Sequence, residues 1–295
     1  LRIILSSIFH VTSQIIFVLM LAYGAQAQKK YEFSYRHIGD EFGLSQNTVT
    51  NIVQDSLGYL WMATNDGLNR YNGLSIEVFK YERDDSTSLS NGWINTLLYD
   101  KSGRLWAGTN RGLNIFNSEE QNFIHVPTDT SKRETLNGVP HEHIFSLSQD
   151  SKGRIWVATW SSLVYTYDGI TFHKPKFASK SNYPIDYINK VVEGKDGTLW
   201  IGLFDSGLLK YDEKKDTLIH YASIRVEGRY DFPKDILSIT EDPVSGDIWL
   251  GTRQSGLFRF DPKTENAYSY ASVTTEGAAF GANIHSQMHY KGRYW

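Results

Sequence analysis

The sequence contains no cysteine, so disulfides, thiolate metal sites and cysteine nucleophiles are all excluded. Net charge is also low, −3 at pH 7, and the chain therefore lacks the basic surface that nucleic-acid binding requires. Several enzyme motifs are missing as well: there is no Gly-x-Ser-x-Gly elbow, phosphate-binding loop or His-Glu-x-x-His. We therefore expect no nucleic-acid partner and no cofactor, and we can assign no catalytic residues.

The first thirty residues differ from the rest of the chain. Arg2 gives a sparse positive start, residues 15–22 form an apolar run, and small residues stand at Ala25 and Ala27. This pattern is typical of a secretory signal peptide, so we expect cleavage after residues 1–27 and a mature domain over residues 28–295. An uncleaved anchor is the alternative, but the apolar run is shorter than the roughly 20 residues of a membrane-spanning helix.

What the chain has in abundance is a tryptophan repeat. A Gly-x-x-Trp motif recurs at intervals of 44 to 50 residues, with its tryptophans at Trp61, Trp106, Trp156, Trp200, Trp249 and Trp295. Such a period matches one four-stranded propeller blade. We predict an all-β fold, a β-propeller with five full antiparallel blades and the start of a sixth. Because the chain begins without methionine and stops at the sixth motif, we expect an incomplete ring from a longer protein.

The second repeat shows how one blade is built. Alternating apolar segments predict strands over 95–100, 104–109, 113–116 and 122–126, joined by tight turns such as Asp100-Lys-Ser-Gly103. A further strand at 31–36 is predicted to complete the last blade. The tryptophans of the five full repeats are predicted to be structural core, because a ligand platform would not need one in every blade. Two residues after each stands Ala or Gly, which lets neighbouring sheets approach.

The segment from Asp100 to Leu113 resembles the two-component regulator propeller repeat, in which Asp, Gly and Trp are followed by Gly-Thr and Gly-Leu. The resemblance extends over residues 31–295; Ser162 and Leu203 depart from the pattern. It implies seven-bladed periplasmic propellers, then a β-sandwich, an inner-membrane helix and a cytoplasmic histidine kinase, which is absent from this chain. A homodimer formed through that kinase would be possible. Many such proteins sense breakdown products of polysaccharides.

Two other repeat families fit less well. The sialidase Asp-box also combines Asp, Gly and Trp, but its Asp stands two positions before Gly, and no arginine triad is evident. WD-type repeats end a strand in Trp-Asp, a dipeptide that this sequence never contains.

A ligand-binding face can be predicted from the meander. The turn after the second strand and the loop entering the first strand must lie on one face, and the residues there change from blade to blade. The candidate ligand-binding residues on this face are Trp93, His143, Trp160, Tyr187, Phe204 and Arg253. Loop residues also vary simply because little constrains them, which is the competing interpretation. The pair His141 and His143 is interpreted as a loop end, and we expect no metal site.

The sequence thus favours a non-enzymatic, periplasmic sensor domain that binds an oligosaccharide or another small molecule. Its other partners would be the remaining blades and the downstream domains of the same protein. Two alternatives stay open. One is a secreted propeller enzyme acting on glycans. The other is a scaffold, or a propeller with a different output such as a diguanylate cyclase or a DNA-binding domain.

Overall fold

The computed structural model describes residues 37–126, 143–159, 164–167, 172–173, 175–179, 188–222, 225–226, 229–230, 234–270, 284, 289–290 and 293–294. Its contacts divide the chain into Leu1–Ile38 and Gly39–Trp295, and the fold is that of the second unit. The predicted signal peptide, the strand at 31–36 and Trp295 lie outside the described residues. Across the described ranges there is no helix with the length and apolar character needed to cross a membrane.

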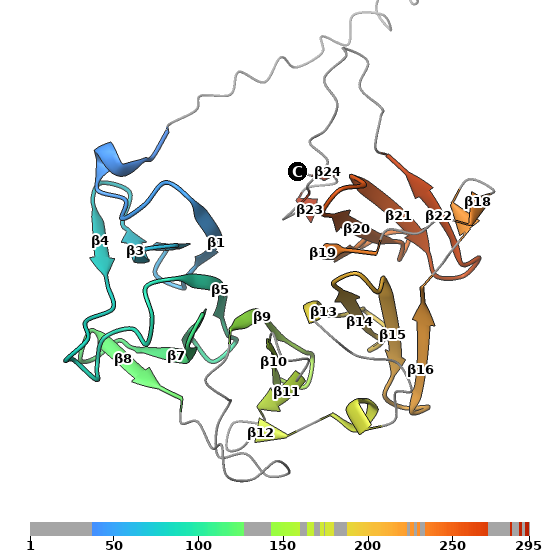
Figure 1. The fold of residues 1–295 in the computed structure, drawn as a ribbon, viewed down its shortest axis with the longest axis horizontal. Coiled ribbons are helices and arrows are strands. Elements are labelled where there is room, and N and C mark those ends of the chain that lie inside the picture. Colours follow the sequence, from blue (N-terminus) through green and yellow to red (C-terminus); the bar gives the residue numbers. More distant parts are fainter. Residues whose placement is uncertain are drawn as a thin grey trace, which may run out of the picture. The chain divides into compact units, whose positions relative to one another are not determined.

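Five antiparallel sheets follow one another along the second unit (Figure 1). The first sheet contains β1 (Val49–Gln54), β2 (Leu60–Thr64), β3 (Gly67–Tyr71) and β4 (Ile76–Phe79). The second contains β5 (Ile94–Tyr99), β6 (Leu105–Thr109), β7 (Gly112–Asn117) and β8 (Asn122–His125). The third contains β9 (Ile144–Gln149), β10 (Ile155–Thr159), β11 (Val164–Tyr167) and β12 (Phe172–His173). The fourth contains β13 (Ile188–Glu193), β14 (Leu199–Leu203), β15 (Leu208–Asp212) and β16 (Thr217–Tyr221). The fifth contains β19 (Ile236–Glu241), β20 (Ile248–Thr252), β21 (Leu257–Asp261) and β22 (Asn266–Ser269).

Short additional elements accompany these sheets. Strand β17 (Arg225–Val226) pairs in parallel with β22 and antiparallel with β18 (Arg229–Tyr230), so the fifth sheet gains two strands. The hairpin β23 (His289–Tyr290) and β24 (Arg293–Tyr294) lies where the sixth repeat was predicted to begin. The 3-10 helices η1 (Asp40–Phe42) and η2 (Lys176–Ser179) complete the described elements. The predicted all-β propeller of four-stranded blades is thus confirmed, and the strands of the second blade end within one residue of their predicted bounds.

The strands of each blade are ordered as in a meander. The first strand lies innermost and the fourth outermost (Figure 1), and each first strand contacts that of the next blade. The described blades do not close on one another. Ile52 of β1 stands at the place of Leu97 in β5, yet its side chain is 57% exposed while Leu97 is buried. Because no described blade precedes β1, this inner face lacks the cover that the later blades have.

The Asp-Gly turn and the tryptophan form one hydrogen-bonded unit. Asp100 accepts bonds from the backbone N–H of Ser102 and Arg104, both 2.9 Å, and from Trp106 Nε1 at 2.8 Å. The same indole bond recurs at Asp55 and Asp150. Gly103 closes the turn with φ 85°, a left-handed conformation that suits glycine. Burial alone would raise the pKa of Asp100, but hydrogen bonds from Ser102, Arg104 and Trp106 outweigh it and lower the pKa to about 2.

The cores lie between blades rather than within them. Trp106 is fully buried and packs with Leu147 of β9, and its ring centroid is 5.5 Å from that of Tyr167 on β11. Trp61 and Trp200 contact Phe116 and Phe260 of the following blade in the same way. Trp156 packs with Val191 of the fourth blade, and Trp249 is half-buried. Each described sheet therefore covers the tryptophan of the sheet before it.

The small residue two positions after the tryptophan lies where its sheet approaches the next sheet closely. A Cβ atom added at Gly108 would lie 2.6 Å from Ile144 Cγ2 of the next blade, and one at Gly202 would lie 2.8 Å from Ile236 Cγ2. Both distances are shorter than real contacts of such atoms, so the spacing between these blades depends on a residue without a side chain.

Side chains at both ends of the inner strands connect neighbouring blades. At one end, the second residue of an inner strand donates to a carbonyl oxygen of the next blade: Thr50 to Ile94 (2.6 Å), Asn95 to Ile144 (3.1 Å) and Asn189 to Ile236 (3.1 Å). At the other end, the last residue accepts from a turn of the preceding blade: Gln149 from Lys101 (2.7 Å), Glu193 from Ser151 (2.5 Å) and Glu241 from Lys195 (2.7 Å).

Removing a core tryptophan should destabilise two blades together. We expect Trp106→Ala or Trp156→Ala to lower the free energy of unfolding by about 3–5 kcal/mol, because the large ring leaves a cavity between sheets. Urea denaturation measures this change. Trp93→Ala is the matched control, since Trp93 is 47% exposed and its loss should cost less than about 1 kcal/mol. Equal midpoints for the core and control variants would contradict a structural role for the repeat.

The low pKa of Asp100 predicts a pH-dependent contribution to stability. A carboxylate whose folded pKa lies near 2, below the unfolded value of about 3.9, stabilises the fold above the unfolded pKa and loses this effect as pH falls toward 2. Asp100→Asn should therefore cost about 2 kcal/mol at pH 7, and the deficit should shrink between about pH 4 and pH 2. Unfolding at several pH values tests this, with the exposed Asp84→Asn as control. A deficit that is constant with pH would argue against the carboxylate's role.

Candidate functional site

Each of the five inner strands begins with an irregularity. In β5 the register with β6 shifts between Ile94 and Thr96, so Asn95 has no partner across the ladder. Equivalent shifts occur in the other four inner strands. A bulge of this kind bends the strand and redirects a side chain. The residues at this bulge position are Thr50, Asn95, Phe145, Asn189 and Leu237.

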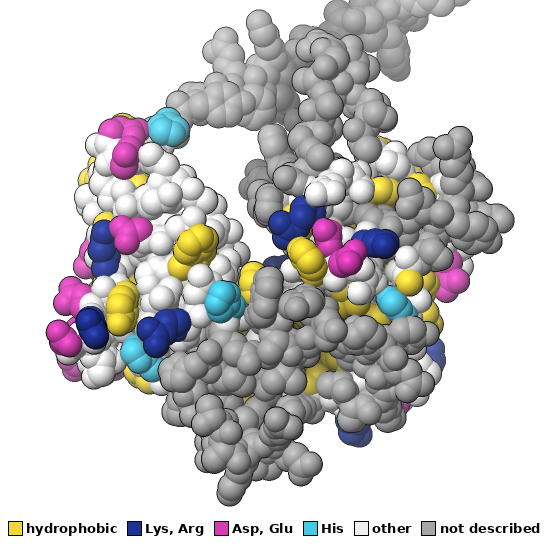
Figure 2. Space-filling model, viewed as in Figure 1, with side chains coloured by type: hydrophobic (Ala, Val, Ile, Leu, Met, Phe, Trp, Pro, Cys, Tyr) yellow, Lys and Arg dark blue, Asp and Glu magenta, His cyan; other side chains and the backbone are white. Residues whose placement is uncertain are grey.

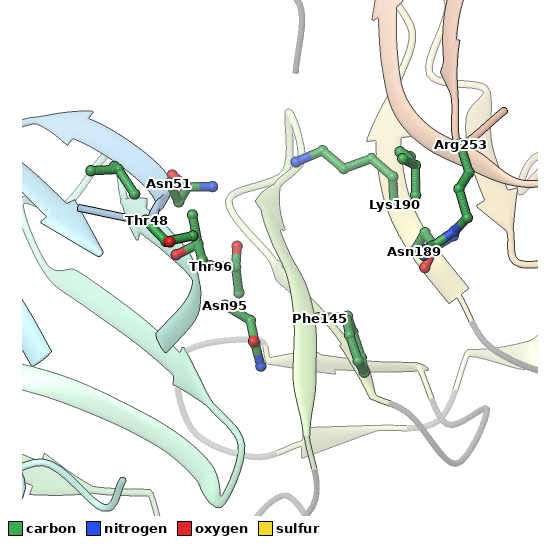
Figure 3. Close-up of a pocket in the computed structure, with 11 residues that line it drawn as sticks. Thr48, Asn51, Asn95, Thr96, Phe145, Asn189, Lys190 and Arg253 are labelled. Atoms are coloured by element: carbon green, nitrogen blue, oxygen red, sulfur yellow. The ribbon is translucent and has the colours of Figure 1, made fainter. Parts of the chain in front are cut away.

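The bulge residues line one pocket of about 500 Å³ (Figure 3). All five blades contribute to it, because each inner strand places its second residue there. The third residues Asn51, Thr96 and Lys190 line it too, as do Thr48, Val49 and Arg253. The pocket is thus assembled from equivalent positions of a repeat, yet its lining differs from blade to blade.

Most of the lining residues are polar, and two of them carry positive charge. Lys190 and Arg253 are the two basic lining residues, and no lining residue is an aspartate or glutamate. Lys190 extends from β13 into the pocket (Figure 3). Burial in this position lowers the pKa of Lys190. Hydroxyl and amide groups supply the remaining hydrogen-bonding capacity, and the ring of Phe145 adds an apolar surface.

Arg253 comes from the turn after β20 and sits in a small cluster. Its backbone N–H donates to the carbonyl of Asp235 at 3.1 Å, and its Nε lies 3.7 Å from Asp235 Oδ2. The guanidinium Cζ is 5.0 Å from the ring centroid of Phe204 in the preceding blade. The turn after the second strand and the loop entering the first strand therefore meet on one face, as the meander predicted.

The other predicted ligand-binding residues lie around this site or outside the described part. Trp93 is exposed, and its carbonyl accepts from Asn110 N–H at 3.1 Å, which again unites the two loops on one face. His143 is exposed, with its ring centroid 6.2 Å from that of Phe145. Neither residue lines the pocket. Trp160 and Tyr187, like Ser162, fall outside the described residues. A ligand-binding role for these residues stays a prediction.

The pocket residues of the inner strands were missed by the sequence analysis, which examined only loop positions. A signal was present. When the inner strands are aligned, the first and fourth residues are aliphatic in every blade, whereas the second residue is Thr, Asn, Phe, Asn or Leu. Variation between two aliphatic positions of each strand marks a place that the core does not constrain.

A second, smaller pocket of about 350 Å³ in the described part is lined in part by Arg154 and Glu213, whose side chains hydrogen-bond each other. On the face shown in Figure 2, hydrophobic, basic and acidic side chains are interspersed rather than gathered into one patch. Among the described residues no cluster of three or more His, Asp or Glu side chains could hold a metal ion.

Comparison with known proteins agrees with this architecture. The model of the two-component regulator propeller matches residues 43–66, 88–111 and 138–161. A histidine kinase, P4, of Formosa agariphila is 36% identical over 74 residues, which are 25% of this chain and 5% of that protein.

Solved extracellular domains assigned to hybrid two-component systems of B. thetaiotaomicron have the same fold. The domain of BT4673 superposes with a TM-score of 0.68 at 21% identity, over 90% of this chain and 36% of that chain. The domain of BT3049 gives 0.62 at 20% identity, over 86% and 39%. The chain thus spans well under half of either structure. Three of the five described blades thus contain a match to the two-component regulator propeller repeat, and the fold is the one seen in these extracellular domains.

Proposed function

We propose that this chain is part of a ligand-sensing propeller of a two-component signalling protein, located outside the cytoplasmic membrane. The observation that carries the proposal is the pocket between the inner strands. Its walls come from equivalent positions in five blades, but they vary in chemistry while the surrounding core repeats. A ligand without the symmetry of the propeller would require this variation, whereas a purely structural centre would not.

An oligosaccharide fits the chemistry of the lining. Asn51, Thr96 and Asn189 offer donors and acceptors for sugar hydroxyls, and Phe145 offers a ring face for stacking. The extracellular location of the similar B. thetaiotaomicron domains and the predicted signal peptide support export of the chain. The similarity to a histidine kinase supports a kinase as the output of the whole protein.

The same side chains that line the pocket also connect the blades. Thr50, Asn95 and Asn189 each bond a carbonyl of the next inner strand while facing the pocket. A ligand that contacts these groups would favour one arrangement of neighbouring blades over another, and so shift the population of two states. The signal would then pass from the inner strands to the rest of the protein.

Ligand titration of the full-length protein tests this proposal. The probes are gluco-, xylo-, manno- and galacto-oligosaccharides of two to six sugars, together with uronate and sulfated oligosaccharides, measured by calorimetry. We expect binding by at least one probe, and at least tenfold weaker binding to Phe145→Ala because the stacking surface is lost. Tyr268→Ala, on the fourth strand β22 of the fifth blade, is the matched control and should bind normally.

Two results would contradict the proposal. Unchanged affinity in Phe145→Ala combined with a loss in Trp93→Ala would move the site from the pocket to the loop tips. Turnover of a bound oligosaccharide, detected as new reducing ends, would indicate an enzyme instead of a sensor.

A further inference from the structure

Lys190 is exceptional among the inner-strand residues of this protein. It is the third residue of β13, and the corresponding residues in the other blades are Asn51, Thr96, Ser146 and Ser238, all small and uncharged. Its side chain extends into the central pocket (Figure 3). Among the described residues, no ion pair or hydrogen bond engages its ammonium group.

Other lysines of this chain show what a structural role looks like. Lys152 pairs with Glu213 at 2.5 Å, and Lys80 pairs with Asp66 at 2.6 Å. Lys210, also in the fourth blade, places its ammonium 5.3 Å from the ring centroid of Trp200. Lys190 has no such partner in the described part of the chain, although it is partly buried and this burial lowers its pKa. An ammonium group in this position is costly unless something else binds it.

The second cation of the pocket is also incompletely satisfied. Arg253 Nε is buried and has no hydrogen-bond partner in the described ranges, since the 3.7 Å to Asp235 Oδ2 is too long for one. Asp235 does not line the pocket, and no carboxylate does. Two basic residues from adjacent blades thus line the pocket and no acidic residue lines it, and of the two only Arg253 has a carboxylate nearby, that of Asp235.

We propose that this pocket selects ligands carrying an acidic group, and that Lys190 binds the carboxylate or sulfate of an acidic sugar. This rests on the proposed function and specifies its ligand class. The neutral part of the lining, with amide and hydroxyl groups beside Phe145, suits the sugar ring itself. An unpaired ammonium then gains its partner only when an acidic ligand enters, so selectivity for charge follows from the desolvation of Lys190.

The decisive experiment compares ligands that differ only in charge. Galacturonate oligosaccharides and their methyl esters form one pair, and sulfated and desulfated galactose oligosaccharides form the other; the two pairs distinguish a carboxylate from a sulfate. We expect the full-length protein to bind the acidic member of at least one pair at least tenfold more tightly. Lys190→Met should abolish this preference, Lys190→Arg should keep it, and Lys214→Met, an exposed lysine in the turn after β15, should leave it unchanged.

Thermal unfolding of the same variants separates a binding role from a structural one. Removing a desolvated charge that has no partner should leave the melting temperature of Lys190→Met equal to or above that of the parent protein. A clear fall in melting temperature, with charge preference retained, would show that Lys190 supports the fold and would overturn the inference.

A probe that is not a sugar tests the inference even if the natural ligand is not among the oligosaccharides used. Lysines are labelled by reductive ¹³C-methylation, and the Lys190 signal is identified by its absence in Lys190→Met. Inorganic sulfate should shift this signal at concentrations that leave the Lys214 signal unchanged. No response of Lys190 to sulfate would overturn the inference. Equal binding of charged and neutral sugars would also overturn it while leaving the proposed sensor function intact, whereas failure of every sugar to bind would count against the proposed function alone.

Discussion

The packing of each tryptophan against the following blade is the contact on which the rest of this structure depends. A single sheet cannot bury its own indole, so Trp61, Trp106, Trp156 and Trp200 are buried only because the next sheet covers them. Stability is therefore shared between neighbours, as in other repeat proteins. In the first three blades the aspartate of the turn completes the contact by accepting the indole N–H, which would otherwise be a buried donor without a partner.

This arrangement leaves the second residue of every inner strand outside the core. The first and fourth residues are committed to packing between blades, but the bulge turns the second residue away from its ladder. Mutation there costs at most a hydrogen bond to the next blade, not a core contact. Binding chemistry can therefore change at Asn95, Phe145 or Asn189 without altering the fold. The blades repeat, but the residues that line the pocket differ from blade to blade.

The fold could be predicted from the sequence because its signals are local. Asp-x-x-Gly fixes a turn, the tryptophan fixes a buried position, and their spacing fixes the blade, so the strands around Trp106 were placed within one residue. The site was harder to predict. A bulge depends on pairing between strands, and the local sequence around Asn95 contains no signal for it. The loop argument did bring Arg253 and Phe204 to one face, but of the two only Arg253 also lines the pocket.

The contact between the third and fourth blades shows how stability and binding are separated between the two ends of a blade. At its pocket end the bulge residue is Phe145, which has no polar group to donate to the next blade as Asn95 and Asn189 do. At the opposite end Arg154 forms two hydrogen bonds to Glu213 of the fourth blade, 2.8 and 3.0 Å long, and these lower the pKa of Glu213 to about 2. The ion pair holds together two blades whose other ends carry Phe145 and Lys190. Because the charged contact lies away from the pocket, both side chains remain available to a ligand.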